Sequence, residues 1–333
     1  MKIGPYSLSN SVFVAPMAGV TDRPFRDQCR RFGAGYAVSE MVASNPLLRD
    51  SRKTRLRLSH DGEAGLRAVQ IVGADPATMA DAARYNVAHG AQVIDINMGC
   101  PAKKVCNTLA GSALMADEAL AAAIIGAVCR AVDIPVTVKM RTGPSVQWRN
   151  AVRIARAAQD AGAAMIVVHG RSRACGFRGE AEYETIAEVK AALTIPVVAN
   201  GDIDSPGKAR AVLRATGADA VMIGRAALGR PWLCGEIAHF LATGEALPAP
   251  DFEELGRRIH DHLHAHHTFY GELDGVRSAR KHVGWYLAGL PAAVGFLQSF
   301  HQLEDAAGQL AALQQFFFTG AANDRSSPWR QVA

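Results

Sequence analysis

The chain has 333 residues, of which 49% are hydrophobic and 20% charged, and its formal net charge is +5. This composition is ordinary for a globular protein and excludes a wholly disordered or collagen-like chain. The charge is unevenly distributed, because residues 246–333 hold 7 Lys and Arg against 9 Asp and Glu. The positive excess therefore lies in residues 1–245, and it is compatible with a polyanionic partner without establishing one.

The sequence offers no signal for export or for a membrane. No apolar run reaches the roughly 18 residues of a membrane-spanning helix, and the longest candidate, Ala119–Val132, is interrupted by Arg130. The first ten residues lack the apolar core of an export signal. The cysteines lie too far apart for paired zinc-site spacing: Cys29, Cys100, Cys106, Cys129, Cys175 and Cys234. We expect a reduced, cytoplasmic monomer with no metal, no membrane association and no obligate protein partner.

Short apolar or β-branched segments recur along the first part of the chain, with helical segments between them. The eight predicted strands are Val12–Met17, Tyr36–Glu40, Arg67–Val72, Val93–Met98, Pro135–Arg141, Ala164–Gly170, Pro196–Asp202 and Ala220–Arg225. Clear start and stop signals bound two of the helices, from Asp75-Pro76 to Gly90 and from Ser205-Pro206 to Gly217. Eight such repeats predict a (β/α)₈ TIM barrel, with a doubly wound sheet as the alternative.

The pattern changes after residue 245. Residues 244–250 (GEALPAP) are typical of a linker, and only helical periodicity follows. The predicted helices are Phe252–Tyr270, Val276–Gly289 and Val294–Thr319. We therefore predict a barrel domain over 1–245, a small all-helical domain over 246–320 and a flexible tail over 321–333.

Polar residues or glycines follow nearly all of the predicted strands. In a TIM barrel these positions meet at the mouth where active sites lie, so we expect Gln70, Asn97, Lys139, His169 and Asn200 to converge there. Strands seven and eight also end in glycines. Gly201 and Gly224, with Arg225, are suited to a phosphate group, although two ordinary turn glycines would give the same pattern.

Two reactive side chains at strand ends have more than one interpretation. Lys139 could form a Schiff base, place positive charge beside a flavin, or be an ordinary surface lysine. Cys100 could be a buried structural thiol, a nucleophile or a proton donor. Nearby Lys103 and Lys104 would favour its thiolate.

Five histidines gather in the first helix after the linker. They are His260, His262, His264, His266 and His267, and some are spaced i, i+4. The apolar positions Leu255, Ile259, Leu263 and Tyr270 predict an amphipathic helix with the histidines on its exposed side. The spacing would also suit a transition metal, but we expect none.

Five motifs together resemble the tRNA-dihydrouridine synthases over nearly the whole chain. They are APMAGVTD (15–22), DINMGCP (95–101), VHGR (168–171), ANGDI (199–203), and ARKH with WYL (279–282 and 285–287). The last motif resembles the bacterial B-type branch. The resemblance implies an FMN barrel with a C-terminal helical domain. Such an enzyme reduces the C5=C6 bond of a tRNA uridine with electrons from NADPH or NADH, and the B type implies position 17 of the D-loop.

Site residues carry over from the family by motif. The resemblance implies Cys100 as proton donor, and it implies as FMN contacts Pro16, Met17, Ala18, Gln70, Lys139, His169, Asn200, Gly201, Asp202, Gly224 and Arg225. A free-pyrimidine reductase, a Lys139 Schiff-base aldolase and an RNA-binding barrel without cofactor are the alternatives.

A tRNA substrate would need base extrusion and basic partners for its phosphates. We expect Asn97 to orient the base. The main predicted tRNA contacts are Lys103, Arg141, Arg171, Arg277, Arg280 and Lys281, with His282 in the same helical cluster. Further rim candidates are Arg49, Arg52, Lys53, Arg55, Arg57, Lys104, Arg173 and Arg178.

Overall fold

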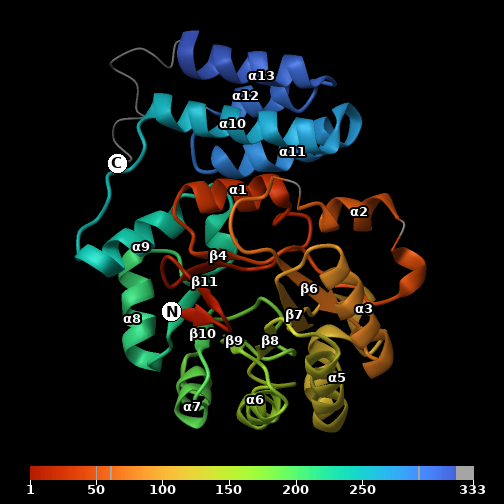
Figure 1. Cartoon of the computed structure of the whole chain (residues 1–333). Coiled ribbons are helices and arrows are strands. Elements are labelled where there is room, and N and C mark those ends of the chain that lie inside the picture. The colour runs from red at the N-terminus through yellow and green to blue at the C-terminus, as the bar shows by residue number, and fades with distance from the viewer. Residues whose placement is uncertain (50, 61, 292, 320–333) are drawn as a thin grey trace.

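The chain folds as a closed parallel barrel, shown in Figure 1. The computed structural model describes residues 1–49, 51–60, 62–291 and 293–319. Neighbouring strands follow the order β4-β3-β11-β10-β9-β8-β7-β6-β5, and a parallel bridge from Val38 to Ala68 joins the end of β4 to β6. The sheet therefore closes on itself, which confirms the predicted TIM barrel. Its strands are β3 (Val12–Val14), β4 (Tyr36–Ala37), β5 (Val42–Ala43), β6 (Ala68–Val72), β7 (Val93–Met98), β8 (Val136–Arg141), β9 (Met165–His169), β10 (Val197–Asn200) and β11 (Ala220–Ile223).

The second strand differs from its prediction, because it is split into β4 and β5. Between them, the Ser39 hydroxyl accepts a hydrogen bond from the backbone N–H of Gln70 at 3.3 Å. The same hydroxyl donates to the carbonyl of Glu40 at 3.0 Å. These side-chain bonds replace regular ladder bonds, so the chain bends where one continuous strand was expected.

Helices surround the barrel, and local capping fixes two of them as predicted. Asp75 caps α3 through the backbone N–H of Thr78, and Ser205 caps α8, which ends at Gly217 in the left-handed conformation. The remaining barrel helices are α1 (Arg23–Arg31), α2 (Arg52–Leu58), α4 (Lys103–Cys106), α5 (Glu118–Ala131), α6 (Ala151–Asp160), α7 (Glu184–Ala192) and α9 (Leu233–Thr243), with α3 at Pro76–Ala88 and α8 at Pro206–Thr216. Short 3₁₀ turns are η1 (Pro46–Leu48), η2 (Gly111–Ala116) and η3 (Arg225–Ala227).

The inside of the barrel changes from apolar to polar along the strands. Near the strand starts, inward side chains such as Phe13, Val93 and Val198 form one apolar cluster, which the short β1–β2 hairpin (Lys2–Ile3 and Tyr6–Ser7) extends with Ile3. Two residues further along β7 and β10, the same inward positions hold Asp95 and Asn200. Because successive side chains alternate between faces, each inward column ends in a polar group at the mouth.

Four further helices and a π-turn follow residues 245–250, where the described chain has no regular structure. The elements are α10 (Phe252–Tyr270), α11 (Glu272–Tyr286), α12 (Ala293–Phe300), α13 (Ala306–Gln314) and η4 (Gln315–Thr319). The prediction of one helix over Val294–Thr319 is wrong, because Asp305 caps a new helix at Gly308. The predicted tail at 321–333 lies outside the described residues, and the domain boundary at 245 stays a prediction.

The C-terminal helices lie together over α1 on one side of the barrel, as Figure 1 shows. They share an apolar core that includes Ile259, Leu263, Val283 and Phe300. In the described part of the chain, no helix combines the length and apolarity needed to cross a membrane.

The histidines of α10 do not follow the predicted amphipathic pattern. His262 and His266 are buried with the core, and His267 is 8% exposed, whereas only His264 is fully on the outside and His260 is half-buried. The expectation failed because both faces of α10 are covered, one by α1 and the other by α11 and α13.

Candidate active site

The barrel mouth contains a buried lysine that hydrogen-bonds to an amide, while the charge of buried Asp95 acts on it without an ion pair. The ammonium of Lys139, at the end of β8, donates to Oδ1 of Asn200 at 2.8 Å, and Asn200 in turn donates to the Met222 carbonyl. No described carboxylate forms an ion pair with Lys139. Burial, reinforced by the charge of Arg141, lowers the pKa of Lys139 to about 8. A buried cation held only by an amide suits an electron-rich ligand placed beside it.

A chain of amide hydrogen bonds fixes the neighbouring strand ends. Gln70 donates to Oδ2 of Asp95 at 2.7 Å and accepts from Nδ2 of Asn97 at 2.6 Å. Oδ1 of Asn97 accepts the backbone N–H groups of Gly99 at 3.1 Å and Cys100 at 3.0 Å. Asn97 therefore positions the Cys100 loop, and its predicted contact with a base stays a prediction.

Cys100 carries a thiol whose proton is retained. Burial raises the pKa of Cys100, and the nearby Arg141 only partly offsets this effect. The expectation that Lys103 and Lys104 favour the thiolate is wrong, because burial raises the pKa of Cys100 and neither lysine is among the groups that lower it. Both lysines are exposed at the start of α4. A protonated thiol can donate a proton, which is the role that the family resemblance implies.

Two arginines predicted to contact RNA are instead buried in internal hydrogen bonds. Arg141 is 1% exposed and donates to the carbonyls of Gly99, Ser172 and Gly176. Arg171 is 4% exposed and forms a bidentate pair with Asp202 at 2.8 and 2.6 Å. They organise the mouth from inside and do not form an exposed rim.

His169 lies beside this arginine network as a neutral imidazole. Arg171 donates toward its Nε2 at 3.4 Å. Burial, together with Lys139, Arg141 and Arg171, lowers the pKa of His169 to about 2. It can therefore offer hydrogen-bonding or stacking contacts without adding charge.

The ends of β10 and β11 leave room for a bound group. Asp202 adopts φ +48, a left-handed conformation that Asp tolerates better than most residues. A Cβ added at Gly201 would approach Ala181 to 2.7 Å, so that glycine is needed for packing. At Gly224 the nearest atom would be 4.0 Å away, so the space beside that backbone is free for a ligand. Arg225 is exposed and 3.5 Å from Asp202.

The loop after β3 presents the other predicted cofactor contacts. Pro16 and Met17 are half-buried and Ala18 is exposed. The Thr21 hydroxyl accepts the Met17 N–H at 2.8 Å and so shapes the loop. Lys281 of α11 donates to the carbonyl of Gly19 at 2.6 Å, which brings the helical region to the barrel mouth.

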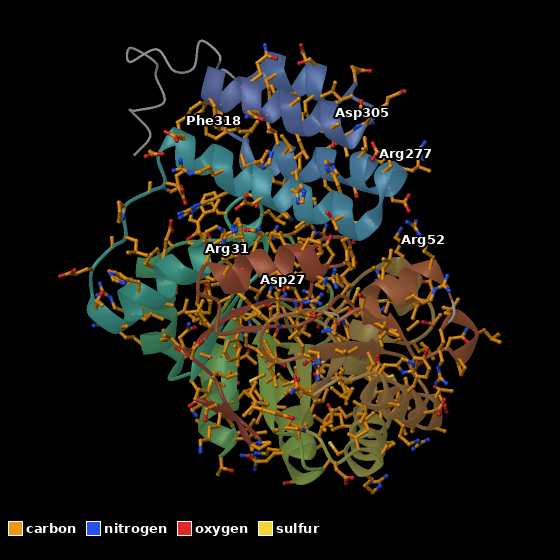
Figure 2. The ribbon with its side chains drawn as sticks, turned by 45° about the horizontal axis from the view of Figure 1, so that its top comes forward. Asp27, Arg31, Arg52, Arg277, Asp305 and Phe318 are labelled. Carbon is orange, nitrogen blue, oxygen red and sulfur yellow. The ribbon has the colours of Figure 1, made fainter. Side chains whose placement is uncertain are left out.

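A cavity of about 540 Å³ lies where this loop meets α2, α10 and α11. Figure 2 shows Arg52 on α2 and Arg277 on α11 at this junction. Both are exposed, and Arg52 pairs with Asp274. The basic residues that line the cavity are Arg23, Arg26, Arg52, Arg57, Arg277 and Lys281. Arg277 and Lys281 line this cavity, and their contact with tRNA stays a prediction.

The two other members of the predicted α11 cluster point elsewhere. Arg280 donates to the Leu303 carbonyl at 3.0 Å, between α11 and the later helices. His282 is 1% exposed, and burial holds the pKa of its imidazole well below the ordinary value. Grouping His282 with the basic residues is therefore wrong, because it is neutral and internal.

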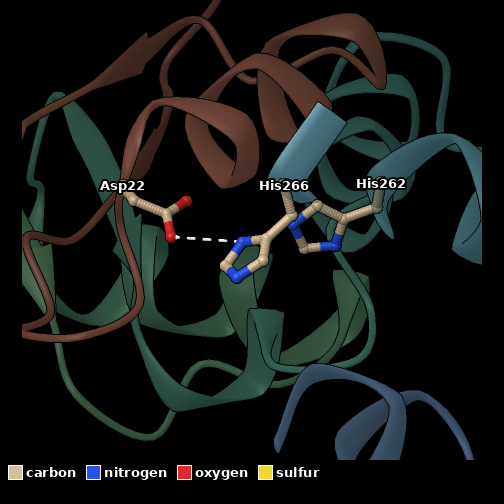
Figure 3. Close-up of side chains that lie close together, drawn as sticks. All are labelled: Asp22, His262 and His266. Atoms are coloured by element: carbon tan, nitrogen blue, oxygen red, sulfur yellow. Dashed lines mark ion pairs between the residues drawn. The ribbon is translucent and has the colours of Figure 1, made fainter. Parts of the chain in front are cut away.

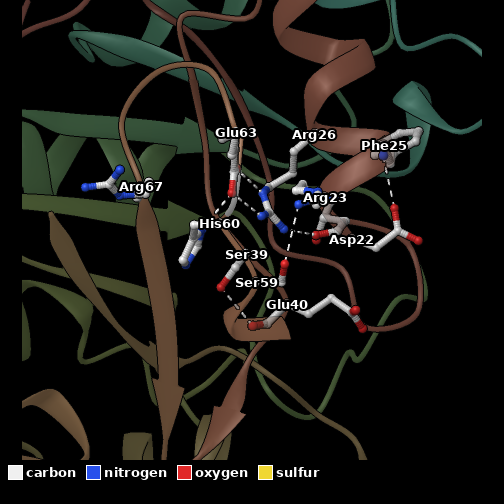
Figure 4. Close-up of polar contacts among 12 residues, drawn as sticks. Asp22, Arg23, Phe25, Arg26, Ser39, Glu40, Ser59, His60, Glu63 and Arg67 are labelled. Carbon is white, nitrogen blue, oxygen red and sulfur yellow. Dashed lines mark hydrogen bonds and ion pairs between the residues drawn. The ribbon is translucent and has the colours of Figure 1, made fainter. Parts of the chain in front are cut away.

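Beneath the cavity, a buried ion network supports α1. Glu63 receives Arg26 in a bidentate pair at 2.7 and 2.6 Å, and also pairs with Arg30 and His60. Figure 4 shows Glu63 between Arg26 and His60. Burial opposes ionisation, but hydrogen bonds from His60 and Arg26 and the charges of Arg26 and Arg30 hold the pKa of Glu63 well below its usual value.

Sequence reasoning missed Asp95 as part of the site. It accepts from Thr137 at 2.6 Å as well as from Gln70, and burial raises its pKa to about 6. The signal was available, since Asp95 and Asn97 are two residues apart on one strand and must face the same side.

The fold and this mouth define a class of protein, a TIM barrel whose polar side chains converge at the ends of its strands. Comparisons with known proteins identify the family within this class. A family model described as dihydrouridine synthase matches residues 13–322. The chain therefore belongs to the dihydrouridine synthase family and is an enzyme of that kind.

Similar curated proteins share most of their length with this chain. The chain is 60% identical over 317 residues to tRNA-dihydrouridine synthase B of Pseudomonas aeruginosa, covering 95% of this chain and 96% of the relative. It is 55% identical to the protein of that name from Salmonella typhimurium, covering 95% and 99%.

Two solved structures share the fold alone. A 2-naphthoyl-CoA reductase complex aligns with a TM-score of 0.56 at 13% identity, covering 74% of this chain and 52% of that one. Histamine dehydrogenase from Rhizobium sp. 4-9 aligns with a TM-score of 0.52 at 12% identity, covering 79% and 50%.

Proposed function

We propose that the protein reduces the C5=C6 bond of a uridine in the tRNA D-loop to 5,6-dihydrouridine, at position 17, with FMN as cofactor and NADPH as electron donor. Family membership and the names of the B-type relatives support the reaction and its substrate. The observation that carries the assignment in this chain is the buried Lys139 ammonium, which an amide alone holds at the barrel mouth.

The residues at the mouth fit a bound flavin mononucleotide. Lys139 would lie against the polar edge of the ring system, where negative charge develops on reduction. Pro16, Met17 and Ala18 would contact the ring, and the open space at Gly224, with Arg225, would take the phosphate. Gln70 is engaged by Asp95 and Asn97, so it would shape this edge together with those partners.

When bound and reduced, FMN supplies the hydride that uracil C6 accepts. The Cys100 thiol donates the proton to C5, which completes reduction of the double bond. The raised pKa keeps this proton on sulfur at neutral pH. Asn97 holds the Cys100 backbone, so that the thiol stays at the mouth.

A tRNA base must leave its stack to reach this mouth. The basic cavity beside the loop after β3 would receive the adjacent phosphates, with Arg277 and Lys281 supplied by α11. A free pyrimidine needs no such surface. The arrangement therefore favours tRNA over a free base as the substrate.

Absorption spectroscopy tests this function directly. The purified chain, reconstituted with FMN if necessary, should show a flavin spectrum that NADPH bleaches without oxygen. Unmodified tRNA should restore the oxidised spectrum, whereas free uridine should not. A chain that binds no FMN, or a reduced enzyme that tRNA does not reoxidise, would overturn the proposal.

A further inference from the structure

A second polar cluster adjoins the cavity, where the barrel meets the C-terminal helices. Asp22 comes from the loop that opens α1, and His262 and His266 stand one turn apart on α10. The facing ligand atoms of these three side chains all lie within 4.8 Å of one another. Figure 3 shows the Asp22 carboxylate facing the His266 ring, with His262 on the same helix. All three residues are at most 4% exposed.

The hydrogen bonds of His266 fix which nitrogen carries its proton. The Ser278 hydroxyl donates to the Asp274 carbonyl at 2.5 Å, so it accepts from Nε2 of His266 at 2.7 Å. The other nitrogen, Nδ1, then presents a lone pair to Oδ2 of Asp22 at 3.6 Å. Two electron-rich atoms therefore face each other, an arrangement that a cation bound between them would stabilise.

A further polar contact of Asp22 comes from α10 itself. Oδ2 of Asp22 already accepts the Tyr270 hydroxyl at 3.0 Å. Each imidazole also has one nitrogen without a partner among the described residues, Nδ1 in His266 and Nε2 in His262.

A third imidazole completes the cluster. The His282 ring on α11 lies 4.9 Å from that of His262 and 5.0 Å from that of His266. Its Nε2 also lacks a described partner. Three buried imidazoles and one carboxylate form the donor set of a closed, four-coordinate zinc site.

The second nitrogens are arranged as in metal-binding histidines. Ligating imidazoles use their other nitrogen for a hydrogen bond that fixes the ring. His266 uses Nε2 for Ser278, and Nδ1 of His262 lies 2.9 Å from the Tyr286 hydroxyl. Asp22 is held in the same way, because its Oδ1 accepts the backbone N–H of Phe25.

We propose that Asp22, His262 and His266, with His282 as the fourth ligand, bind a structural divalent transition-metal ion, with zinc as the best match, that fastens α10 and α11 to the barrel. In a tetrahedral zinc site with bonds of about 2.1 Å, the ligand atoms are roughly 3.4 Å apart. The Asp22–His266 separation of 3.6 Å already meets this requirement, and the His262 ligand atom lies within 4.8 Å of both. His282 lies outside this 4.8 Å group, so its ring would turn toward the ion on binding.

The first test is the metal content of tag-free, full-length protein, measured by mass spectrometry after dialysis. We expect one zinc ion per chain. After removal with a strong chelator, added zinc should restore it and raise the midpoint of thermal unfolding by roughly 5 °C at saturating concentration. Cobalt should give the visible absorption bands of a tetrahedral nitrogen and oxygen site.

Variants separate a metal site from a structural polar cluster. His266→Gln should weaken zinc binding by at least about 100-fold, and Ser278→Ala by about 10- to 100-fold. His264→Gln is the matched control, because His264 lies on the same helix but is exposed. It should bind zinc as the parent chain does.

The outcomes are decisive without any assay of tRNA reduction. Folding of the Ser278→Ala chain is checked by circular dichroism, so that lost binding is not confused with unfolding. The proposal is overturned if the wild-type chain contains no transition metal and neither zinc nor cobalt changes its stability or spectrum. It is also overturned if His264→Gln loses metal as His266→Gln does.

Discussion

The barrel mouth and the region beneath α1 both bury charged side chains, but they differ in the groups that contact those charges. Beneath α1, Arg26 and Arg30 surround Glu63, so each buried cation has an anion in contact. At the mouth, Lys139 is 9% exposed and hydrogen-bonds only to the amide of Asn200, with Asp95 acting on it without an ion pair. The ion pairs beneath α1 neutralise the buried charges within the fold. The Lys139 ammonium, in contrast, remains able to interact with a negatively charged or electron-rich ligand.

The comparison predicts that substitutions at the mouth impair function more than folding. Substitutions beneath α1 should impair folding more than function.

Cys100→Ala is expected to have the largest effect on activity. Loss of the proton donor should slow dihydrouridine formation by about 100- to 10,000-fold. FMN binding and NADPH oxidation should remain, as measured by flavin absorbance and by mass spectrometry of the tRNA. Cys106→Ala is the control, and full activity in Cys100→Ala would remove the proton-donor assignment.

Glu63→Gln should produce the largest loss of stability. It leaves Arg26 and Arg30 buried without a counter-charge, which costs roughly 3–5 kcal/mol of unfolding free energy. Because the folded pKa of Glu63 is depressed, its contribution is present above about pH 4.5 and is lost as the pH falls. Denaturant unfolding at several pH values measures both effects. Glu118→Gln, at an exposed pair with Arg153, should change stability little.

Lys139→Met should weaken ligand binding without lowering the stability of the fold. Loss of a charge-assisted contact of about 1.5–3 kcal/mol should weaken FMN binding by about 10- to 100-fold. The cofactor-free variant should be at least as stable as the parent at pH 7, because it no longer buries a charge. The folded pKa of about 8 lies below the ordinary 10.5, so this advantage should shrink as the pH rises from 8 toward 10.5. A variant that is strongly destabilised at pH 7 would contradict the comparison.

Asp202→Asn should have a smaller effect, since Asn also tolerates φ near +48 and keeps one acceptor oxygen, while the charge and the other acceptor are removed. We expect a loss of about 1–2 kcal/mol, allowing for partial exposure. Burial opposes ionisation of Asp202, but Arg171 holds its pKa below the ordinary value. The stabilisation is therefore present above about pH 3.8 and lost below it. Unfolding curves at pH 7 and pH 3 should differ less in the variant than in the parent.

Local sequence signals determined much of the fold. Short apolar and β-branched segments predicted the strands, and the caps at Asp75 and Ser205 predicted helix boundaries that the structure confirms. These signals act between residues a few positions apart, so one sequence is enough to find them. The motifs around Asn97 and Asn200 likewise identified the family and the mouth of the barrel.

Tertiary structure alone decided what the polar side chains face. Arg171 looked like an exposed phosphate contact, but Asp202, from the next strand, holds it inside. His266 looked like a surface residue, but α10 is covered on both faces, and Asp22 lies opposite it although 244 positions away in the sequence. Periodicity reports which side of a helix is apolar. Periodicity cannot show which segment, distant in the sequence, packs against the other side. That packing determines how buried each polar group is, whether it is charged and whether it can bind a ligand.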